Sequence, residues 1–196
     1  ILDVSAVVKA LNLTAGFILH PDEQRLDVVC DKGILLEKQT SLDVALTLLN
    51  MDAKANNVVK RVFLPTWARD ATYYDSLKID RGNYSNFKAE RLKKYDLVAT
   101  GEGNFAFTEF MSHRDSIYAT LKILELASRY GMKLSEIIAS LPIFYYRLFK
   151  VECSQAMKGK TMRAFLEDAQ DKKTSTVDGV KVWLDENDWI LMIPDQ

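Results

Sequence analysis

The sequence predicts an α/β protein followed by a small α+β domain, and two observations carry this prediction. Up to about residue 142, short apolar runs typical of buried strands alternate with segments whose apolar residues recur at helical spacing. Such alternation favours a mostly parallel sheet covered by helices. From residue 143 the order changes to strand, helix and hairpin, so we expect a domain boundary near residues 141–146.

The chain opens with an expected helix and hairpin. Apolar residues at helical spacing start at Val4, and two short apolar runs, 15–19 and 26–30, flank a polar loop. We therefore expect a helix and two strands, followed by a glycine turn at residues 31–33. Ser41 is the expected N-cap of the next helix.

The rest of the α/β part continues the alternation. In chain order we expect a strand at 58–64, short helices at 71–77 and 86–94, a strand at 96–100, a helix at 115–129 that stops at Gly131, and a short helix that Ser135 caps and Pro142 ends. Beyond it we expect a strand at 145–153, a helix at 158–168, and a hairpin that pairs residues 180–184 with 189–193.

Composition excludes several classes of protein. The 196 residues carry 26 Lys and Arg against 27 Asp and Glu, for a net charge of -1, with no basic block that would attract nucleic acid. No apolar run reaches membrane-spanning length and no signal peptide is present, so we expect a cytoplasmic protein without a membrane partner. Cys30 and Cys153 are far apart and build no zinc motif. Because the chain starts at Ile1, we expect a piece of a longer polypeptide.

A polar loop between the first two expected strands is the first candidate site. Carboxylates at alternate positions of a tight loop converge on a divalent cation, but only Asp22 is acidic here, between the neutral His20 and Gln24. Asp22 is either a turn residue or a weak cation ligand. Arg25 either binds a phosphate or pairs with Asp22 or Glu23.

A glycine-punctuated turn at residues 101–104 is the second candidate. Glu102 could accept two hydrogen bonds from sugar hydroxyls, with Asn104 beside it, although solvated glutamates are also common in turns. His113 and Arg114 precede the expected helix at 115–129. There they either bind an anion together with the helix amides or simply precede a cap at Asp115 or Ser116.

The order of these segments resembles the C-terminal portion of the α-phosphohexomutases, the phosphomannomutase and phosphoglucomutase family. The segment Gly101-Glu102-Gly103-Asn104, the run that starts at His113 and enters a long helix, and Asp178-Gly179-Val180 with Trp189-Ile190-Leu191 carry the resemblance. It implies a mixed-sheet middle domain. It divides the chain into the end of a second domain (1–30), a third domain (31–142) and a partial fourth domain (143–196).

The resemblance also implies the loss of groups on which mutase chemistry depends. Asp22, Arg25 and Glu102 match the family, and Asn104 could replace a serine that reads a hydroxyl. The chain departs from the family at four places in the sequence. In the metal loop, His20 and Gln24 replace aspartates; elsewhere, Asn83 and Ala106 each replace a histidine. At the end, Ile193-Pro194-Asp195 replaces an Arg-Pro-Ser phosphate loop.

We therefore expect a phosphohexomutase-like region without mutase activity, with no catalytic residue and no cofactor of its own. The pattern is similar to the C-terminal portion of mannose-1-phosphate guanylyltransferase-type proteins. In that interpretation the chain binds a hexose phosphate or organises the remainder of its parent polypeptide. The alternative is the back half of a working phosphomannomutase or phosphoglucomutase that holds Mg²⁺ at Asp22. No Thr-Ala-Ser-His type phosphorylation segment occurs in these residues.

Overall fold

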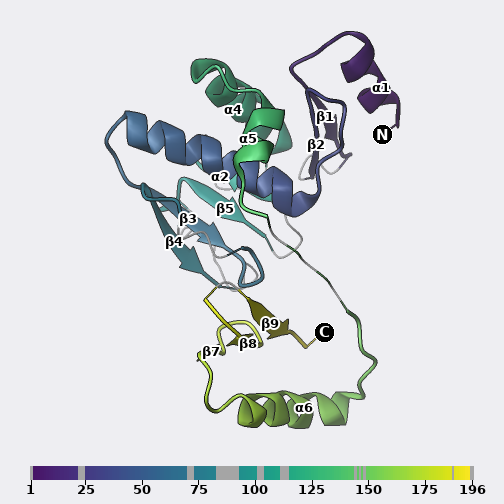
Figure 1. Ribbon diagram of the computed structural model, residues 1–196, viewed down its shortest axis with the longest axis vertical. Coiled ribbons are helices and arrows are strands. Elements are labelled where there is room, and N and C mark those ends of the chain that lie inside the picture. The colour runs from purple at the N-terminus through teal and green to yellow at the C-terminus, as the bar shows by residue number, and fades with distance from the viewer. Residues whose placement is uncertain are drawn as a thin grey trace. The chain divides into compact units, whose positions relative to one another are not determined.

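The computed structural model divides the chain into two compact units, residues 1–142 and residues 143–196 (Figure 1). It describes residues 2–21, 25–69, 73–82, 93–100, 104–110, 115–143, 145, 147, 149–186 and 188–194. The expected fold class is confirmed, because an α/β unit with a mixed sheet precedes a small unit with an antiparallel sheet. The division at residue 30 stays a prediction. No described helix is both long and apolar enough to cross a membrane.

The larger unit begins with a helix and a hairpin. Helix α1 (Leu2–Ala10) precedes strands β1 (Ala15–Leu19) and β2 (Leu26–Cys30), which pair antiparallel from Ala15↔Cys30 to Leu19↔Leu26. A Cβ on Gly16 would lie 2.7 Å from Val4 and Val8, so a glycine here lets α1 pack directly on β1. The expected turn after β2 is confirmed, with Gly33 at φ +66°.

A four-stranded mixed sheet follows, in the order β4-β3-β5-β6. Strands β3 (Lys60–Leu64), β4 (Leu77–Arg81) and β5 (Leu97–Ala99) are parallel, and β6 (Phe105–Phe107) pairs antiparallel with β5. The strands expected at 58–64 and 96–100 are confirmed.

The helix expected at 71–77 is wrong over its described part, because residues 73–76 form turns and Leu77 begins β4. Most of the helix expected at 86–94 lies outside the described residues. Strand β6 was not expected from the sequence.

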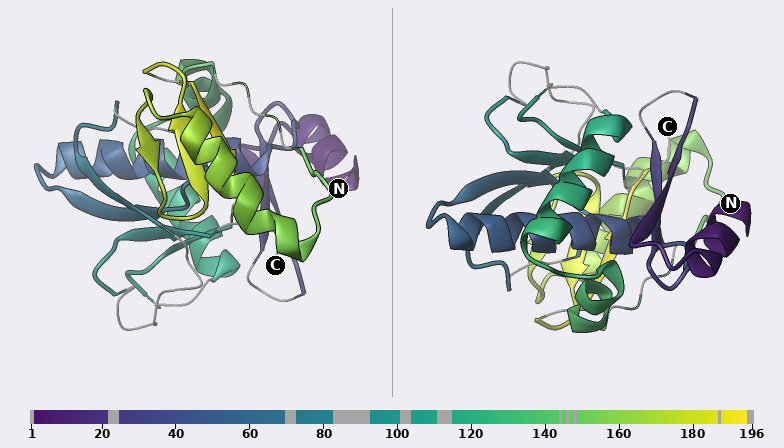
Figure 2. Two further views of the ribbon diagram at one scale, coloured as in Figure 1. Left: turned by 90° about the horizontal axis from the view of Figure 1, so that it is seen from below. Right: turned by 90° about the horizontal axis from the view of Figure 1, so that it is seen from above.

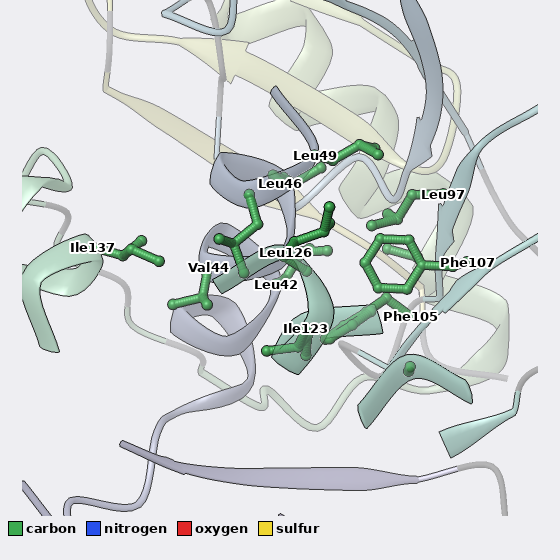
Figure 3. Packing of buried hydrophobic residues seen from close by; sticks show 14 of the residues in the cluster. Leu42, Val44, Leu46, Leu49, Leu97, Phe105, Phe107, Ile123, Leu126 and Ile137 are labelled. Carbon is green, nitrogen blue, oxygen red and sulfur yellow. The ribbon is translucent and has the colours of Figure 1, made fainter. Parts of the chain in front are cut away.

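Helices α2 (Lys38–Ala55) and α4 (Ser116–Arg129) pack against each other and against one face of this sheet, with α5 (Leu134–Ser140) beside α2 (Figures 1 and 2). Their apolar side chains meet those of the strands in a single core (Figure 3). The core includes Leu42, Leu46, Leu49, Leu97, Phe105, Phe107, Ile123 and Leu126. The opposite face of the sheet carries a smaller buried cluster of Phe63, Tyr95 and Val98.

Two of the expected helix caps are wrong. Ser41 is buried inside α2, which starts at Lys38 after Glu37. Ser135 lies inside α5, where its amide and hydroxyl donate to the Asp31 carboxylate at 2.8 and 2.7 Å and so join this helix to the turn after β2. The cap at Asp115 is confirmed, since its carboxylate accepts from the amide of Tyr118 at 2.9 Å.

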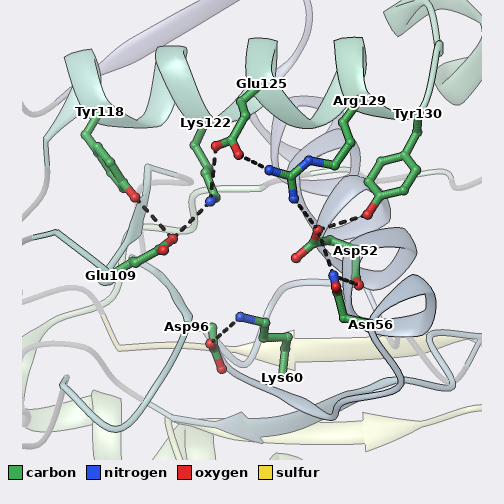
Figure 4. A network of polar contacts seen from close by, with 10 residues as sticks. All are labelled: Asp52, Asn56, Lys60, Asp96, Glu109, Tyr118, Lys122, Glu125, Arg129 and Tyr130. Atoms are coloured by element: carbon green, nitrogen blue, oxygen red, sulfur yellow. Dashed lines mark hydrogen bonds and ion pairs between the residues drawn. The ribbon is translucent and has the colours of Figure 1, made fainter.

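Helix α2 also carries two buried acids that bind different neighbours. Asp52 accepts hydrogen bonds from Arg129 Nη1 at 3.0 Å and from the Tyr130 hydroxyl at 2.9 Å, which links α2 to the end of α4 (Figure 4). Asp43, only 1% exposed, accepts from Gln39 at 2.9 Å and pairs with Arg69 at 3.5 Å. Burial raises the pKa of Asp43 to about 6, although the charge of Arg69 and the Gln39 hydrogen bond oppose the rise.

The smaller unit packs one helix on a three-stranded antiparallel sheet. Helix α6 (Gln155–Asp168) covers strands β7 (Thr174–Ser175), β8 (Val180–Trp183) and β9 (Trp189–Met192), which pair in that order. The expected helix and hairpin are therefore confirmed. The strand expected at 145–153 is wrong: the described residues there join no sheet, and Tyr145 and Val151 are 91% and 84% exposed.

The pKa of Asp43 predicts a pH dependence of stability. A carboxyl whose pKa is about 6 when folded and 3.8 in its ordinary state binds its proton more tightly in the native protein, so the free energy of unfolding falls as pH rises from about 4 to 6 and is flat above. Asp43→Asn removes this titration. We expect its stability relative to wild type to rise by about 2 kcal/mol between pH 4 and pH 7.

Urea unfolding followed by circular dichroism at the two pH values measures this difference. Asp3→Asn, at an exposed position of α1, is the control for the loss of one aspartate. Parallel pH profiles for wild type and Asp43→Asn would contradict the prediction.

Candidate functional site

The carboxyl ends of three parallel strands meet at one edge of the mixed sheet. β3 lies between β4 and β5; the chain leaves β3 toward β4 on one side and leaves β5 toward β6 on the other (Figure 1). The strand order therefore reverses between β3 and β5. Ligands of open α/β sheets bind outside the carboxyl ends of the strands at such a reversal. We call this place the switch-point edge, and it is the candidate site.

The loop that follows β3, residues 65–69, is fixed at this edge by the last side chain of β4. Arg81 Nη1 donates to the carbonyl oxygens of Pro65 at 3.3 Å and Ala68 at 2.8 Å, and its Nη2 donates to that of Arg69 at 2.6 Å. A single guanidinium therefore satisfies three carbonyls of an irregular segment. The loop is thereby tied to the neighbouring strand.

Buried polar side chains lie at the ends of both central strands. Thr66 is 6% exposed, and Thr100 and Asn104 are each 4% exposed. The Thr100 amide donates to the Asn104 carbonyl at 2.7 Å, which closes the connection between β5 and β6. The Thr100 hydroxyl has no hydrogen-bond partner among the described residues. The structure thus brings Asn104 to the switch-point edge, whereas Glu102 lies outside the described residues, in the short connection that Thr100 and Asn104 flank.

The candidate metal loop connects β1 and β2. The His20 amide donates to the Arg25 carbonyl at 3.2 Å, and His20 Nε2 lies 2.9 Å from the Asp27 carboxylate across the hairpin. Arg25 is exposed, and Asp22 and Gln24 lie outside the described residues. Within the described part of the chain, no group of three or more His, Cys, Asp or Glu side chains is placed to hold a metal ion. His20 therefore serves as a link between the two strands.

The remaining candidates lie along β6, before α4 and after β9. Ala106 is buried in the middle of β6, opposite Val98. His113 and Arg114 lie outside the described residues, and so do Asn83 and Asp195. Ile193 is 46% exposed where the chain leaves β9. Beside it, a pocket of about 380 Å³ in the smaller unit is lined by Met162, Arg163, Leu166, Thr176, Gly179, Val180 and Pro194.

Sequence reasoning missed Thr66, Thr100 and Arg81. A threonine within two residues of the end of each of two expected strands was a usable signal, because the carboxyl ends of parallel strands share one edge. Arg81 gave no such signal, because β4 itself was not expected. Apart from the arginines of the 65–69 loop and β4, the polar side chains described at this edge are hydroxyls and an amide, a chemistry that suits hydrogen bonds to sugar hydroxyls but not proton transfer near pH 7.

No family model matches the chain, but individual proteins do. The phosphoglucosamine mutase of Methanococcus maripaludis is 32% identical over 111 residues, which are 54% of this chain and 25% of that protein. That of Methanococcus vannielii is 31% identical over 198 residues, covering 96% of this chain and 44% of the relative. The chain thus spans less than half the length of the curated relatives it matches.

Solved structures have the same fold. A phosphoglucomutase/phosphomannomutase family protein of Burkholderia thailandensis has a TM-score of 0.67 at 21% identity, over 92% of this chain and 40% of that one. An N-acetylphosphoglucosamine mutase of Aspergillus fumigatus, solved with GlcNAc-6P and magnesium, has a TM-score of 0.55 at 12% identity, over 86% and 44%. The chain is therefore homologous to a part of the phosphohexomutases, the family of phosphoglucosamine mutase, phosphoglucomutase and phosphomannomutase.

Proposed function

We propose that this chain binds a hexose phosphate at the switch-point edge and forms a sugar-binding region of a phosphohexomutase-type protein. The observation that carries the proposal is the position of residues 101–104. In sequence they connect β5, which ends at Ala99, to β6, which starts at Phe105, and β5 is one of the two strands between which the strand order reverses, where an α/β sheet binds its ligand. The homology to phosphohexomutases supports a sugar phosphate as that ligand.

The side chains available at this edge suit the recognition of hydroxyl groups. A carboxylate at Glu102 can accept hydrogen bonds from two neighbouring sugar hydroxyls, and the Asn104 amide both donates and accepts. Thr66 and Thr100 add buried hydroxyls on the two central strands. We propose that the phosphate group is bound by three basic side chains, Arg25, His113 and Arg114.

We further propose that the region binds sugar phosphate without mutase chemistry. His20 and Ala106 stand where the family has an aspartate and a histidine: His20 is hydrogen-bonded to Asp27 within the hairpin, and Ala106 has no titratable group. We also propose that the chain is part of a longer polypeptide of the mannose-1-phosphate guanylyltransferase type. The mutase names of the relatives favour the alternative, in which the chain is the back half of a working mutase and Asp22 holds Mg²⁺.

Calorimetric titration tests the binding proposal. The probes are the 1-phosphates and 6-phosphates of glucose and mannose, together with glucosamine 6-phosphate. We expect at least one of them to bind. Glu102→Ala should weaken that binding about tenfold to a hundredfold, because a hydrogen bond to a charged group contributes about 1.5–3 kcal/mol.

Glu167→Gln, at an exposed position of α6, is the matched control and should bind as wild type does. Absence of heat with all five ligands would contradict the proposal. Equal affinities of wild type and Glu102→Ala would exclude Glu102 from the site.

Phosphorus NMR of the full-length polypeptide distinguishes the proposal from its alternative. We expect no conversion between the 1-phosphates and 6-phosphates, with or without Mg²⁺, because only Asp22 of the metal-loop aspartates is kept and two histidines of the family are replaced. Conversion that depends on Mg²⁺ and is lost in Asp22→Ala would establish the alternative instead. Asp3→Asn controls for the removal of an exposed aspartate elsewhere.

A further inference from the structure

Arg81 is a half-buried arginine whose side chain binds backbone carbonyls at the switch-point edge. Its two terminal nitrogens donate to the carbonyl oxygens of Pro65, Ala68 and Arg69, at 3.3, 2.8 and 2.6 Å. These bonds span 12 to 16 positions of sequence and join the end of β4 to the loop after β3. They engage both terminal nitrogens in binding the protein's own backbone.

The loop that Arg81 holds is irregular and mostly buried. Residues 65–69 belong to neither a helix nor a strand, yet Pro65, Thr66 and Ala68 are buried. A buried carbonyl without a donor costs about 1–3 kcal/mol, so carbonyls in such a loop need partners. At its end, the Arg69 side chain reaches Asp43 on α2 at 3.5 Å and donates to the Pro142 carbonyl at 2.8 Å.

We propose that Arg81 is a positioning residue for the ligand: it fixes the 65–69 loop so that the buried Thr66 stays at the switch-point edge. This inference rests on the proposed function, because it takes a hexose phosphate as the ligand. Arg81 acts through the loop and does not itself bind the phosphate. Loss of its side chain therefore frees the loop and weakens binding.

The geometry requires a guanidinium. Its planar fork presents several donors in fixed directions, so that one side chain serves three carbonyls, whereas the ammonium of lysine is a compact charge on a flexible stem. Arg81→Lys keeps the charge but loses the fork. It should therefore resemble Arg81→Met more than wild type, which a role in binding the phosphate by charge alone would not produce.

Trp67 supplies a direct measure of the loop. It lies within residues 65–69, and the other two tryptophans, Trp183 and Trp189, belong to the smaller unit. In a Trp183→Phe/Trp189→Phe background, the emission of Trp67 and its quenching by acrylamide report the loop without any ligand. This readout separates local loosening from a general loss of stability.

The matched control is Arg61→Met, in the same sheet. Arg61, near the start of β3, donates to Asp80, the residue before Arg81 on β4, at 2.9 Å. Its described hydrogen bonds go to Asp80 and Asp96, so this variant removes an arginine from the same strand pair without removing a bond to the 65–69 loop. Each variant is first shown to be folded by circular dichroism at low temperature. If Arg81→Met does not fold, Arg81→Lys and Arg81→Gln carry the test.

We expect Arg81→Met to raise acrylamide quenching of Trp67 at least twofold and the Kd for the best-bound hexose phosphate at least tenfold, with partial rescue of both by ethylguanidinium. Arg61→Met should change neither. Unchanged quenching and unchanged Kd in a folded Arg81 variant, in a protein that binds hexose phosphate, overturn this inference alone. Absence of binding by the parent protein overturns the proposed function, and the quenching then still decides whether Arg81 holds the loop.

Discussion

The packing of α2 against the mixed sheet and against α4 is the interaction on which the rest of the larger unit depends. Burial of a large aliphatic side chain contributes about 1.5–3 kcal/mol, and α2 places several in the shared core, among them Leu42, Leu46 and Leu49. α2 leads from the hairpin into β3, the strand with a parallel neighbour on each side. The position of this helix therefore sets where β3 ends and, with it, the place of the switch-point edge.

The two buried acids of α2 follow from the same packing. A helix covered along most of its length must find partners inside the protein for its polar side chains, because an unpaired buried charge is costly. Asp43 finds Arg69, five residues beyond β3, and Asp52 finds Arg129 and Tyr130 at the end of α4. The raised pKa of Asp43 shows that its pairing only partly offsets burial, which is consistent with a contact of 3.5 Å.

The sequence predicted those elements whose stability is local. The hairpin 15–30 and the helix capped by Asp115 carry regular apolar spacing and turn residues, and both were correct within a few residues. β4 was missed because the alternation of apolar and charged residues in its sequence, Leu-Lys-Ile-Asp-Arg, is short and ends in two charged residues. Partners from elsewhere in the chain, such as Arg61 for Asp80, stabilise this outer strand of the described sheet. The strand expected at 145–153 has the right composition but no partner strand among the described residues. Composition alone cannot supply that partner.

The residues of the candidate site also differ in whether the sequence alone could predict them. Glu102 and Asn104 could be identified from a glycine-punctuated turn, whereas the role of Arg81 depends on carbonyls that only the folded chain brings near it. Ligand binding and catalysis also depend on different features of the structure. The position of a binding site at the carboxyl ends of parallel strands is determined by the sheet topology and tolerates many substitutions, but proton transfer and metal binding need particular side chains. Ala106 lies in the middle of β6 and leaves its pairing with β5 intact, so the shape of this edge can persist independently of the side chains that catalysis would need.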